Sequence, residues 1–394
     1  MKTGIMGGTF DPVHIGHIEM SLIAKRELEL DRVLFIPTGH PPHKPCPFAD
    51  GAQRIKMLKL ALSAYPDFEI SDIEVDRSGT TYTIDTLTEL KKQYPNDEFT
   101  YIIGGDTLFA AEKWVRFSDV CALCNFVVVP RPGIDLADLL REAKRLEQKY
   151  SMRVHVSKVF APDVSSTELR YRASKNEDLS KYMPKAVEAY IKEHGFYHIA
   201  PLRDSISAFL KNTLSPKRYR HSVGTEHASV ELAQHYGADR LKASLAGLAH
   251  DCAKELSKVD ALELAKKHGV ELDPILYSNP SLLHGENGAI IAEKELGISD
   301  PEILDAIRTH TSGDGSRDMT LLQKIVFLAD YIEPTRDFPG VDDLRKIAYN
   351  DIDKACLEAV KGTMREILSR NALLHPRSVL FYNHLIELIN QKGG

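Results

Sequence analysis

The sequence predicts two folds in succession: an α/β domain built on a doubly wound parallel sheet, followed by an all-α domain. The chain has 394 residues, more than one domain normally holds. Short β-branched and aromatic runs alternate with segments of helical period up to about residue 198, and beyond about residue 203 the helical period continues alone. We therefore expect one domain at residues 1–198 and another at 203–394, with the boundary at residues 198–203.

Six strands are expected in the first domain. They are residues 3–6, 33–36, 69–75, 101–103, 126–129 and 154–156. Apolar residues spaced three or four apart between these runs each place one apolar stripe on a helix. Two such sets are Ile15, Ile18 and Leu22, and Ile55, Leu58 and Leu62. Alternating strands and helices favour a mostly parallel sheet with helices on both faces, whose ligands lie beyond the C-terminal ends of the strands.

The second domain is expected to be helical throughout. Its apolar residues repeat at helical spacing in four sets: Leu241, Leu245 and Leu248; Ile303 and Ile307; Leu321, Ile325 and Leu328; Leu385 and Leu388. Three prolines stand where a first helical turn would begin, in Ser215-Pro216, Asp300-Pro301 and His375-Pro376. Proline at this position costs the helix no hydrogen bond, so it marks helix starts.

Composition and charge exclude several classes of protein. Hydrophobic residues make up 43% and charged residues 27%, which is typical of a globular chain. Lys and Arg number 50 against 56 Asp and Glu, and this net charge of -6 disfavours nucleic acid as the main partner. The 5 cysteines form no disulfide framework, and no apolar run approaches the length of a membrane span. We therefore expect a cytoplasmic protein with no membrane partner.

The first strand is followed by a glycine-rich turn that opens into a helix. The turn reads Gly7-Gly8-Thr9-Phe10-Asp11-Pro12-Val13-His14-Ile15-Gly16-His17. Glycine lets the backbone approach a ligand, and a helix start directs unpaired N–H groups at it, which favours polyphosphate. His14 and His17 lie three residues apart, so both rings can lie on one face as donors to phosphate oxygens. A lone histidine here would more often be a cap or a packed side chain, but the pair in this setting favours phosphate binding.

This turn resembles the H-x-G-H signature of the nucleotidylyltransferase superfamily, and the longer string resembles the nicotinate-nucleotide adenylyltransferases. Four further segments match that family in order: Pro41-Pro42-His43-Lys44, Tyr82-Thr83-Ile84-Asp85-Thr86-Leu87, Gly104-Gly105-Asp106 followed by Trp114, and Ser165-Ser166-Thr167-Glu168-Leu169-Arg170. The resemblance covers residues 1–198. It implies a Rossmann-like fold and the transfer of an adenylyl group from ATP to nicotinate mononucleotide, with Mg²⁺ assisting and pyrophosphate leaving.

The resemblance also implies roles for individual residues. We expect His14, His17 and Lys44 to bind the triphosphate, and Ser165, Ser166, Thr167 and Arg170 to hold the leaving pyrophosphate. Thr83 and Trp114 are assigned to the nicotinate end, Gly104 and Asp106 to the adenosine side, and the backbone of Gly7, Gly8, Thr9 and Phe10 to the phosphates. Arg131 follows a strand, where a phosphate contact and a surface salt bridge are both open.

Several of these residues have simpler explanations when each is taken alone. Lys44 would be a solvated loop charge, Ser165 a helix N-cap and Trp114 a packing residue. The family usually has alanine where Gly105 stands. Cys121-x-x-Cys124 has zinc-like spacing but lacks a second pair, so we interpret both cysteines as core residues. A cytidylyl or pantetheine-phosphate adenylyl transferase is the rival activity.

The helical half carries histidines and aspartates suited to a pair of metal ions. They are His221, His250, Asp251, His284, His310 and Asp330. Adjacent His250 and Asp251 point about 100° apart on a helix, so the aspartate can bridge two metals while histidines of neighbouring helices complete each ligand set. Helical bundles build metal sites in this way. His227, His235, His268 and His375 lack such neighbours, and we expect them to be structural or on the surface.

The order of these residues resembles the HD-domain metal-dependent phosphohydrolases. His250-Asp251-Cys252-Ala253-Lys254, His310-Thr311-Ser312-Gly313 and Asp330-Tyr331-Ile332-Glu333-Pro334-Thr335-Arg336 resemble the branch that cleaves diadenosine tetraphosphate symmetrically into two ADP. The resemblance spans about residues 203–390 and implies a di-iron centre, with Mn²⁺ or another divalent ion as the alternative. It makes Lys254 and Arg336 candidates for the phosphates of the substrate.

Other functions of the helical half stay open at this point. Its substrate could instead be (p)ppGpp, a deoxynucleotide or a cyclic nucleotide, and the half could also be a nucleotide-sensing module without turnover. The sequence predicts a bifunctional enzyme whose partners are ATP, nicotinate mononucleotide and dinucleoside polyphosphates. It leaves the oligomeric state, including a homo-oligomer, undecided.

Overall fold

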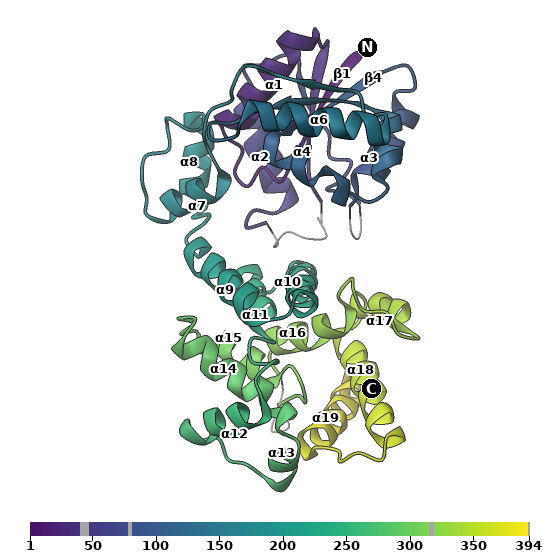
Figure 1. The fold of residues 1–394 in the computed structure, drawn as a ribbon. Helices are drawn as coiled ribbons and strands as arrows, with labels where there is room; N and C mark the ends of the chain where they lie inside the picture. The colour runs from purple at the N-terminus through teal and green to yellow at the C-terminus, as the bar shows by residue number, and fades with distance from the viewer. Residues whose placement is uncertain (40–46, 78–80, 315–318, 393–394) are drawn as a thin grey trace. The chain divides into compact units, whose positions relative to one another are not determined.

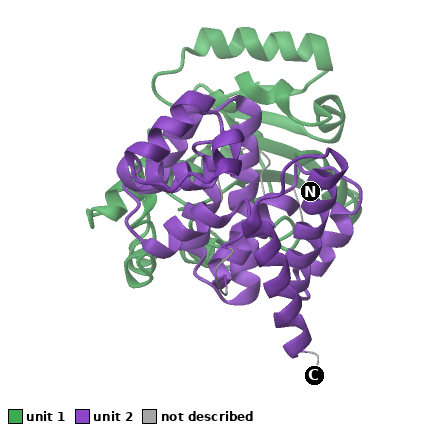
Figure 2. Cartoon of the chain, turned by 90° about the horizontal axis from the view of Figure 1, so that it is seen from below, with its two compact units in different colours: residues 1–42, 47–201 green, residues 43–46, 202–394 purple. Residues whose placement is uncertain are grey.

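The computed structural model describes residues 1–39, 47–77, 81–314 and 319–392, and these residues divide into two compact units (Figures 1 and 2). Unit 1 holds the described residues up to Pro201, and unit 2 holds those from Leu202 onward. The division falls in the first turn of helix α9, which begins at Ala200.

Unit 1 contains a six-stranded sheet and the helices that cover it. The strands are β1 (Lys2–Gly8), β2 (Arg32–Pro37), β3 (Phe68–Ile70), β4 (Glu98–Gly104), β5 (Asn125–Val129) and β6 (Val154–Val156). The helices are α1 (Ile15–Leu28), α2 (Gly51–Leu62), α3 (Thr83–Gln93), α4 (Gly105–Ala110), the short 3-10 helix η1 (Ala111–Lys113), α5 (Phe117–Leu123), α6 (Leu136–Tyr150), α7 (Ser166–Ser174) and α8 (Lys185–Glu193).

All neighbouring strands are parallel, in the order β3-β2-β1-β4-β5-β6. The strand order reverses between β1 and β4, and their register pairs Ile5 with Tyr101. In open α/β sheets the crevice at such a reversal, beyond the C-terminal strand ends, is where ligands bind. The predicted doubly wound parallel sheet is confirmed, and the glycine turn after β1 lies at its switch point.

Helices cover both faces of this sheet and create two cores (Figure 1). On one face, residues such as Met6 and Phe35 pack with α1, α2, α7 and α8. On the other, residues such as Ile5 and Leu34 pack with α3, α4, α5 and α6. Adjacent residues of one strand enter opposite cores because side chains alternate across a sheet, which explains why the strands have continuous apolar runs.

One predicted strand is too long. Residues 69–75 were expected to be extended, but β3 ends at Ile70. The N–H of Ser71 donates to the Phe35 carbonyl at 3.0 Å, and the carbonyl of Asp72 then accepts from Val75 and Asp76 at 2.8 and 3.1 Å, which closes a turn. The expectation of a longer strand came from Ile73 and Val75, which lie partly buried in this turn. Residue types that favour a strand also occur where a turn packs against the core.

Unit 2 is all-helical, as predicted. Its helices are α9 (Ala200–Thr213), α10 (Pro216–Tyr236), α11 (Arg240–Ala249), α12 (Lys258–Lys267), α13 (Pro274–Ser278), η2 (Pro280–Leu283), α14 (His284–Lys294), α15 (Pro301–Thr309), α16 (Leu321–Ile332), α17 (Val341–Ala348), α18 (Ile352–Ser369) and α19 (Pro376–Lys392). Ser215 and Asp300 cap α10 and α15 directly before Pro216 and Pro301, so the helix starts marked by proline are confirmed.

Close helix contacts in unit 2 depend on glycines. α10 packs against α11 and α16, and α14 packs against α15. A Cβ on Gly285 would lie 2.5 Å from the Arg308 carbonyl oxygen, and one on Gly247 would lie 2.6 Å from Ser229 Oγ. These glycines let neighbouring helices approach more closely than a side chain would permit, α11 against α10 at Gly247 and α14 against α15 at Gly285.

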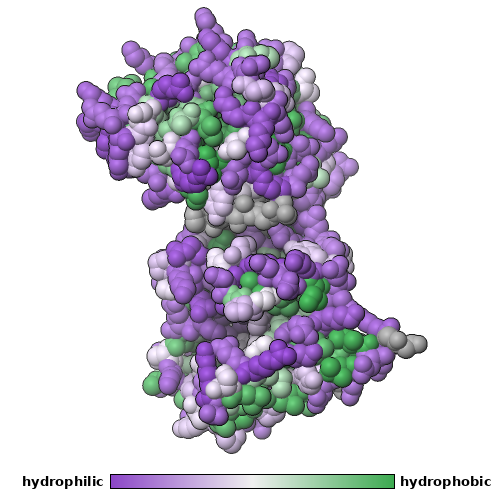
Figure 3. Space-filling view, turned by 90° about the vertical axis from the view of Figure 1, so that its right-hand side faces the viewer, coloured by the Kyte–Doolittle hydropathy of each residue, from purple (hydrophilic) through white to green (hydrophobic). Residues whose placement is uncertain are grey.

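Among the described residues, no helix combines the length and the apolar character needed to span a bilayer. On the face drawn in Figure 3, hydrophilic side chains predominate and hydrophobic ones lie in separate groups among them.

Cys121 and Cys124 are buried in the core with α5, which confirms their interpretation as core residues.

The buried carboxylate of Asp11 yields a prediction about unit 1. Tyr197 is fully buried and its hydroxyl donates to Asp11 Oδ1 at 2.9 Å. We expect Tyr197→Phe to reduce the free energy of unfolding of unit 1 by about 2 kcal/mol, because a hydrogen bond to a charged acceptor is lost. The measurement is urea unfolding of the full chain followed by a unit 1 signal such as Trp114 fluorescence. Tyr65→Phe is the control, since its ring stacks on Phe68 and the described residues give its hydroxyl no partner; an equal effect in both variants would contradict the prediction.

Candidate functional site

The turn after β1 is shaped to present its backbone to a ligand. Phe10 adopts the left-handed conformation, with φ of 51°, and its ring is 1% exposed. That ring packs against the His17 imidazole at a centroid distance of 4.9 Å. Because the Phe10 ring is buried in this contact, Phe10 can offer a ligand only its backbone. The carbonyl of Thr9 accepts from Arg54 Nη1 at 2.9 Å, and the same nitrogen donates to the Thr38 carbonyl at 2.8 Å, which holds the turn to the end of β2.

His14 and His17 stack face to face at the start of α1, with ring centroids 3.8 Å apart. The backbone N–H of His14 donates to His17 Nδ1 at 3.3 Å. Gly16 makes this possible, because a Cβ there would lie 3.0 Å from the His14 ring. Burial, assisted by the charge of Arg131, lowers the pKa of His14 to about 3, so its imidazole is neutral at physiological pH. Its buried Nδ1 has no hydrogen-bond partner among the described residues.

Helix α7 lies against the same turn. Ser166 Oγ donates to the Pro12 carbonyl at 3.1 Å, and Arg170 Nη1 donates to the Asp11 carbonyl at 3.0 Å. Ser165 caps the helix by accepting from the Glu168 N–H, and Thr167 Oγ1 accepts from Arg170 Nη2 at 3.0 Å. The structure thus brings the Ser165–Arg170 segment beside the turn that leads to His14. Both helix N-termini offer N–H groups and positive partial charge for an anion.

An aromatic group lies on the β4 side of the switch point. The Tyr101 and Trp114 rings meet edge to face at 5.5 Å, and the Thr83 side chain lies near the Tyr101 hydroxyl. A Cβ on Gly7 would lie 2.2 Å from the Tyr101 hydroxyl, so Gly7 is required for the strand to pass this ring. Trp114 also belongs to the core next to Phe117. Because Trp114 is only partly buried, its indole can pack in this core and still present one side to a ligand, as its predicted role requires.

The end of β4 leads to the exposed side chain of Asp106. A Cβ on Gly104 would lie 2.7 Å from Asp106 Oδ1, and one on Gly105 would lie 2.9 Å from Ile134. The close packing explains why glycine stands at position 105. Arg131 acts on His14 through its charge, and its buried Nε has no partner among the described residues. Lys44 lies outside the described residues.

In unit 2, five helices contribute the six ligand-type residues. His221 lies within α10, His250 and Asp251 follow α11, His284 begins α14, His310 follows α15 and Asp330 lies within α16. Five of the six are buried, and Asp330 is partly exposed. Two groups of three have ligand atoms within 4.8 Å of one another: His221, His250 and Asp330, and His250, Asp251 and His310.

Asp251 lies between these histidines, with an oxygen directed to each side. Its Oδ2 is 3.7 Å from His221 Nε2 and 3.5 Å from His250 Nε2. Its Oδ1 is 3.5 Å from the Nε2 atoms of both His284 and His310. The Nε2 atoms of His284 and His310 are 3.1 Å apart, and those of His221 and His250 are 3.3 Å apart. Four imidazole nitrogens therefore converge on one carboxylate.

The donor chemistry of this cluster fits divalent cations. His250, His284 and His310 each direct Nδ1 at a backbone carbonyl, of Gly247, Ser281 and Ile307, at 2.6–2.7 Å. These acceptors place the proton on Nδ1 and leave a lone pair on each Nε2. Facing lone pairs about 3 Å apart repel unless a proton or a cation lies between them. Burial and the charge of Lys254 lower the pKa of His284 to about 3, which keeps that imidazole neutral as a ligand must be.

Three cationic side chains touch the cluster. Arg218 Nη1 is 2.7 Å from Asp251 Oδ2, and Lys254 Nζ is 2.9 Å from His284 Nε2. Arg336 forms an ion pair with Asp330 and donates from Nε to its backbone carbonyl at 2.6 Å. Although burial opposes ionisation, the hydrogen bond from His221 and the charge of Arg336 hold the pKa of Asp330 below its usual range. The site therefore joins ionised carboxylates to cations that could receive phosphate oxygens.

Comparison with known proteins assigns the two halves separately. Residues 5–172 match the cytidylyltransferase-like family and residues 218–335 match the HD domain. A "Probable nicotinate-nucleotide adenylyltransferase" of Lachnoclostridium phytofermentans is 39% identical over 197 residues, covering 50% of this chain and 98% of the relative. The symmetrical bis(5'-nucleosyl)-tetraphosphatase of Bacillus subtilis is 41% identical over 190 residues, covering 47% of this chain and 98% of the relative.

The chain belongs to the nicotinate-nucleotide adenylyltransferase family and also carries an HD domain. A solved structure of a predicted HD superfamily hydrolase involved in NAD metabolism, from Clostridium acetobutylicum, is 43% identical, covers 47% of this chain and 96% of its own, and has a TM-score of 0.46. The family matches and the curated relatives confirm, at the level of family and domain, the two resemblances found in the sequence.

Residue patterns alone missed several groups around the two sites. In the adenylyltransferase half these are Tyr101, which packs on Trp114, and Arg54, which holds the turn after β1. In the HD half they are Arg218 and Glu333; the latter accepts from His221 Nδ1 at 3.0 Å. Arg218 stands three residues before His221, which could have drawn attention to it. Arg54 and Tyr101 lie in ordinary helix and strand patterns that gave no such signal.

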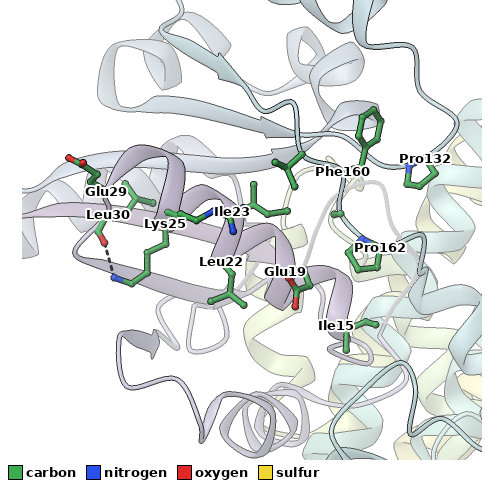
Figure 4. Close-up of a pocket in the computed structure, with 13 residues that line it drawn as sticks. Ile15, Glu19, Leu22, Ile23, Lys25, Glu29, Leu30, Pro132, Phe160 and Pro162 are labelled. Carbon is green, nitrogen blue, oxygen red and sulfur yellow. Dashed lines mark hydrogen bonds between the residues drawn. The ribbon is translucent and has the colours of Figure 1, made fainter.

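A separate groove lies along the outer side of α1 in the adenylyltransferase half (Figure 4). Its volume is about 1180 Å³, and it is bounded by α1 residues such as Leu22 and by the segment that includes Phe160 and Pro162. Neither His14 nor His17 lines it. Its walls mix apolar residues with the charged side chains of Glu19, Lys25, Arg26 and Glu29 and contain neither histidine, so we do not place the nucleotide there.

The buried state of His14 predicts how the adenylyltransferase half responds to acid. The folded pKa of about 3 lies below the ordinary 6.5, so as the pH falls below 6.5 the unfolded chain takes up a proton that the folded chain does not. Between pH 7.5 and pH 5 this removes on the order of 2 kcal/mol of stability. Denaturant unfolding at both pH values should show a correspondingly smaller loss for His14→Gln than for the wild type. Equal losses in the two proteins would show that His14 titrates normally.

Proposed function

We propose that residues 1–198 transfer the adenylyl group of ATP to nicotinate mononucleotide, giving deamido-NAD and pyrophosphate. The observation that carries this proposal is the convergence of His14, His17 and the α7 residues Ser166 and Arg170 on the turn after β1, at the switch point of the sheet. The similarity to named adenylyltransferases supports the choice of substrates.

The reaction requires no protein nucleophile. The phosphate of the mononucleotide attacks the α-phosphorus of ATP in line, a new P–O bond forms, and the bond to the pyrophosphate oxygen breaks. Neutral His14 can donate one hydrogen bond to a phosphate oxygen, while Arg170 and the N-terminus of α7 can receive the leaving pyrophosphate. Mg²⁺, when bound with ATP, neutralises part of the phosphate charge. Thr83 and Trp114 would position the pyridine ring.

We further propose that residues 203–394 hydrolyse a dinucleoside polyphosphate, with diadenosine tetraphosphate cleaved to two ADP. The converging Nε2 atoms around Asp251 support a two-cation centre, and the Bacillus subtilis relative supports the substrate. Iron is the proposed cation and Mn²⁺ the alternative; when bound, such an ion would supply Lewis acidity for the attack of water on the polyphosphate. His221, His250, His284, His310, Asp251 and Asp330 would hold the ions. Arg218, Lys254 and Arg336 would bind the phosphates.

Separate variants test whether the two halves carry separate activities. His17→Ala should reduce deamido-NAD formation at least about a hundredfold and leave tetraphosphate hydrolysis unchanged, since a phosphate donor is removed at one site only. Asp251→Ala should do the reverse, because it removes the carboxylate shared by both cation positions. Both activities are measured on the full chain, so each variant is the control for the other. Loss of both activities from either change, in folded protein, would contradict the two-site division.

Trp114 provides a test of substrate choice. Trp114→Ala should raise the KM for nicotinate mononucleotide about tenfold and change the KM for ATP little, because the indole would contact only the pyridine ring. Trp114→Phe is the matched control and should recover most of the affinity. Nicotinamide mononucleotide should be a poorer substrate of the wild type; equal use of both mononucleotides, or of pantetheine phosphate, would contradict the assignment.

The alternative for the HD half is nucleotide sensing without turnover. Metal analysis of the purified full chain, combined with hydrolysis assays on diadenosine tetraphosphate, (p)ppGpp and cyclic nucleotides, distinguishes the alternatives. Protein that retains no metal and turns over none of these nucleotides with iron or Mn²⁺ added would favour the sensing function. Preference for another nucleotide would keep the hydrolase and change its substrate.

A further inference from the structure

The four histidines of the HD site are not held alike. Three of them direct Nδ1 at backbone carbonyls, whereas His221 directs Nδ1 at the carboxylate of Glu333, 3.0 Å away. A carbonyl is a neutral acceptor, but a carboxylate gives its imidazole partial anionic character and raises its basicity as a ligand. We therefore expect His221 Nε2 to be the strongest of the four electron-pair donors to a cation.

Glu333 is held for this contact. It is 0% exposed, and its oxygens accept from the Thr335 N–H at 2.7 Å and from the Thr335 hydroxyl at 2.5 Å. α10 leaves room for it at Gly224, where a Cβ would lie 2.4 Å from Glu333 Oε2. A completely buried carboxylate costs free energy unless it is paired, so these contacts indicate a position defined by the fold rather than a chance approach.

The charges on the two sides of Asp251 differ as well. The His221 side holds the carboxylates of Asp330 and Glu333, faced by the guanidinium groups of Arg336 and Arg218. The opposite side, with His284 and His310, adds no carboxylate of its own among the described residues. Lys254 faces it, with Nζ 2.9 Å from His284 Nε2. The His221 side is thus the more negative by one charge, and the other side meets an ammonium group at a ligand atom.

We propose that Glu333 is a positioning residue that makes the two cation positions unequal, so that the position at His221 and Asp330 fills first and the position at His284 and His310 fills second. This inference rests on the proposed two-cation centre. It implies that the chain exists in a one-cation state at low cation concentration, and that the cation beside Lys254 is the exchangeable one.

Calorimetric titration of the metal-free full chain with Mn²⁺ tests the order of filling. We expect two steps of one equivalent each, with affinities at least about tenfold apart. Glu333→Gln keeps the size of the side chain but removes its charge, and should weaken the tighter step about 10- to 100-fold while leaving the weaker step unchanged. His284→Ala should abolish the weaker step and keep the tighter step at its wild-type affinity.

A matched control is Glu286→Gln, a carboxylate of the same unit that pairs with Arg308 and Arg377 instead of a ligand imidazole. It should leave both steps unchanged, and thermal unfolding should show all variants folded. Two equal steps in the wild type, an unaltered tight step in Glu333→Gln, or loss of the tight step in His284→Ala would each overturn the inference. Two equal steps with intact hydrolysis would leave the proposed function standing, whereas no Mn²⁺ binding would overturn both.

Discussion

A carboxylate removed from water must be surrounded by partners, and both halves of this chain depend on that requirement. In the adenylyltransferase half, buried Asp11 accepts the N–H groups of Phe48 and Ala49 and the hydroxyl of Tyr197. These contacts tie the turn after β1 to the segment before α2 and to the end of the unit. In the HD half, Asp251 lies among four imidazoles and the guanidinium of Arg218, which come from α10, α14, α15 and the end of α11. In each half, the hydrogen-bond and ion-pair partners of one buried carboxylate, Asp11 or Asp251, hold the segments around the candidate site together.

Side chains and backbones can approach this closely around both sites only where a neighbouring residue has no side chain, and glycine stands at these positions. At Gly7 the backbone of β1 passes the Tyr101 hydroxyl, and at Gly224 helix α10 admits Glu333; any Cβ would overlap the neighbouring oxygen. Gly285 lets α14 approach the Arg308 carbonyl of α15, which brings His284 to His310. These glycines are needed because they have no side chain, and not because they adopt a backbone conformation that other residues avoid. Substituting them would separate side chains that must meet.

Histidine serves two different purposes in the two halves, and its environment decides which. His14 is buried beside Arg131, remains neutral, and has an Nδ1 without a partner among the described residues, as suits a donor awaiting a phosphate oxygen. The HD histidines have Nδ1 engaged and Nε2 exposed to one another, as suits ligands of a cation. The same side chain is therefore suited to donate a hydrogen bond in the first half and an electron pair in the second.

The sequence by itself determined the features that depend on local pattern: the parallel α/β sheet followed by helices, the glycine turn with His14 and His17, the proline-marked helix starts and the set of ligand-type residues. Period, glycine and proline act over a few residues, so they can be recognised without coordinates. Tertiary structure alone decided that β3 stops at Ile70 and that Tyr101 adjoins Trp114. It also decided that Glu333 holds His221 across 112 residues of chain. Such contacts depend on how whole helices and strands pack, and residues so far apart carry no shared period that would reveal them.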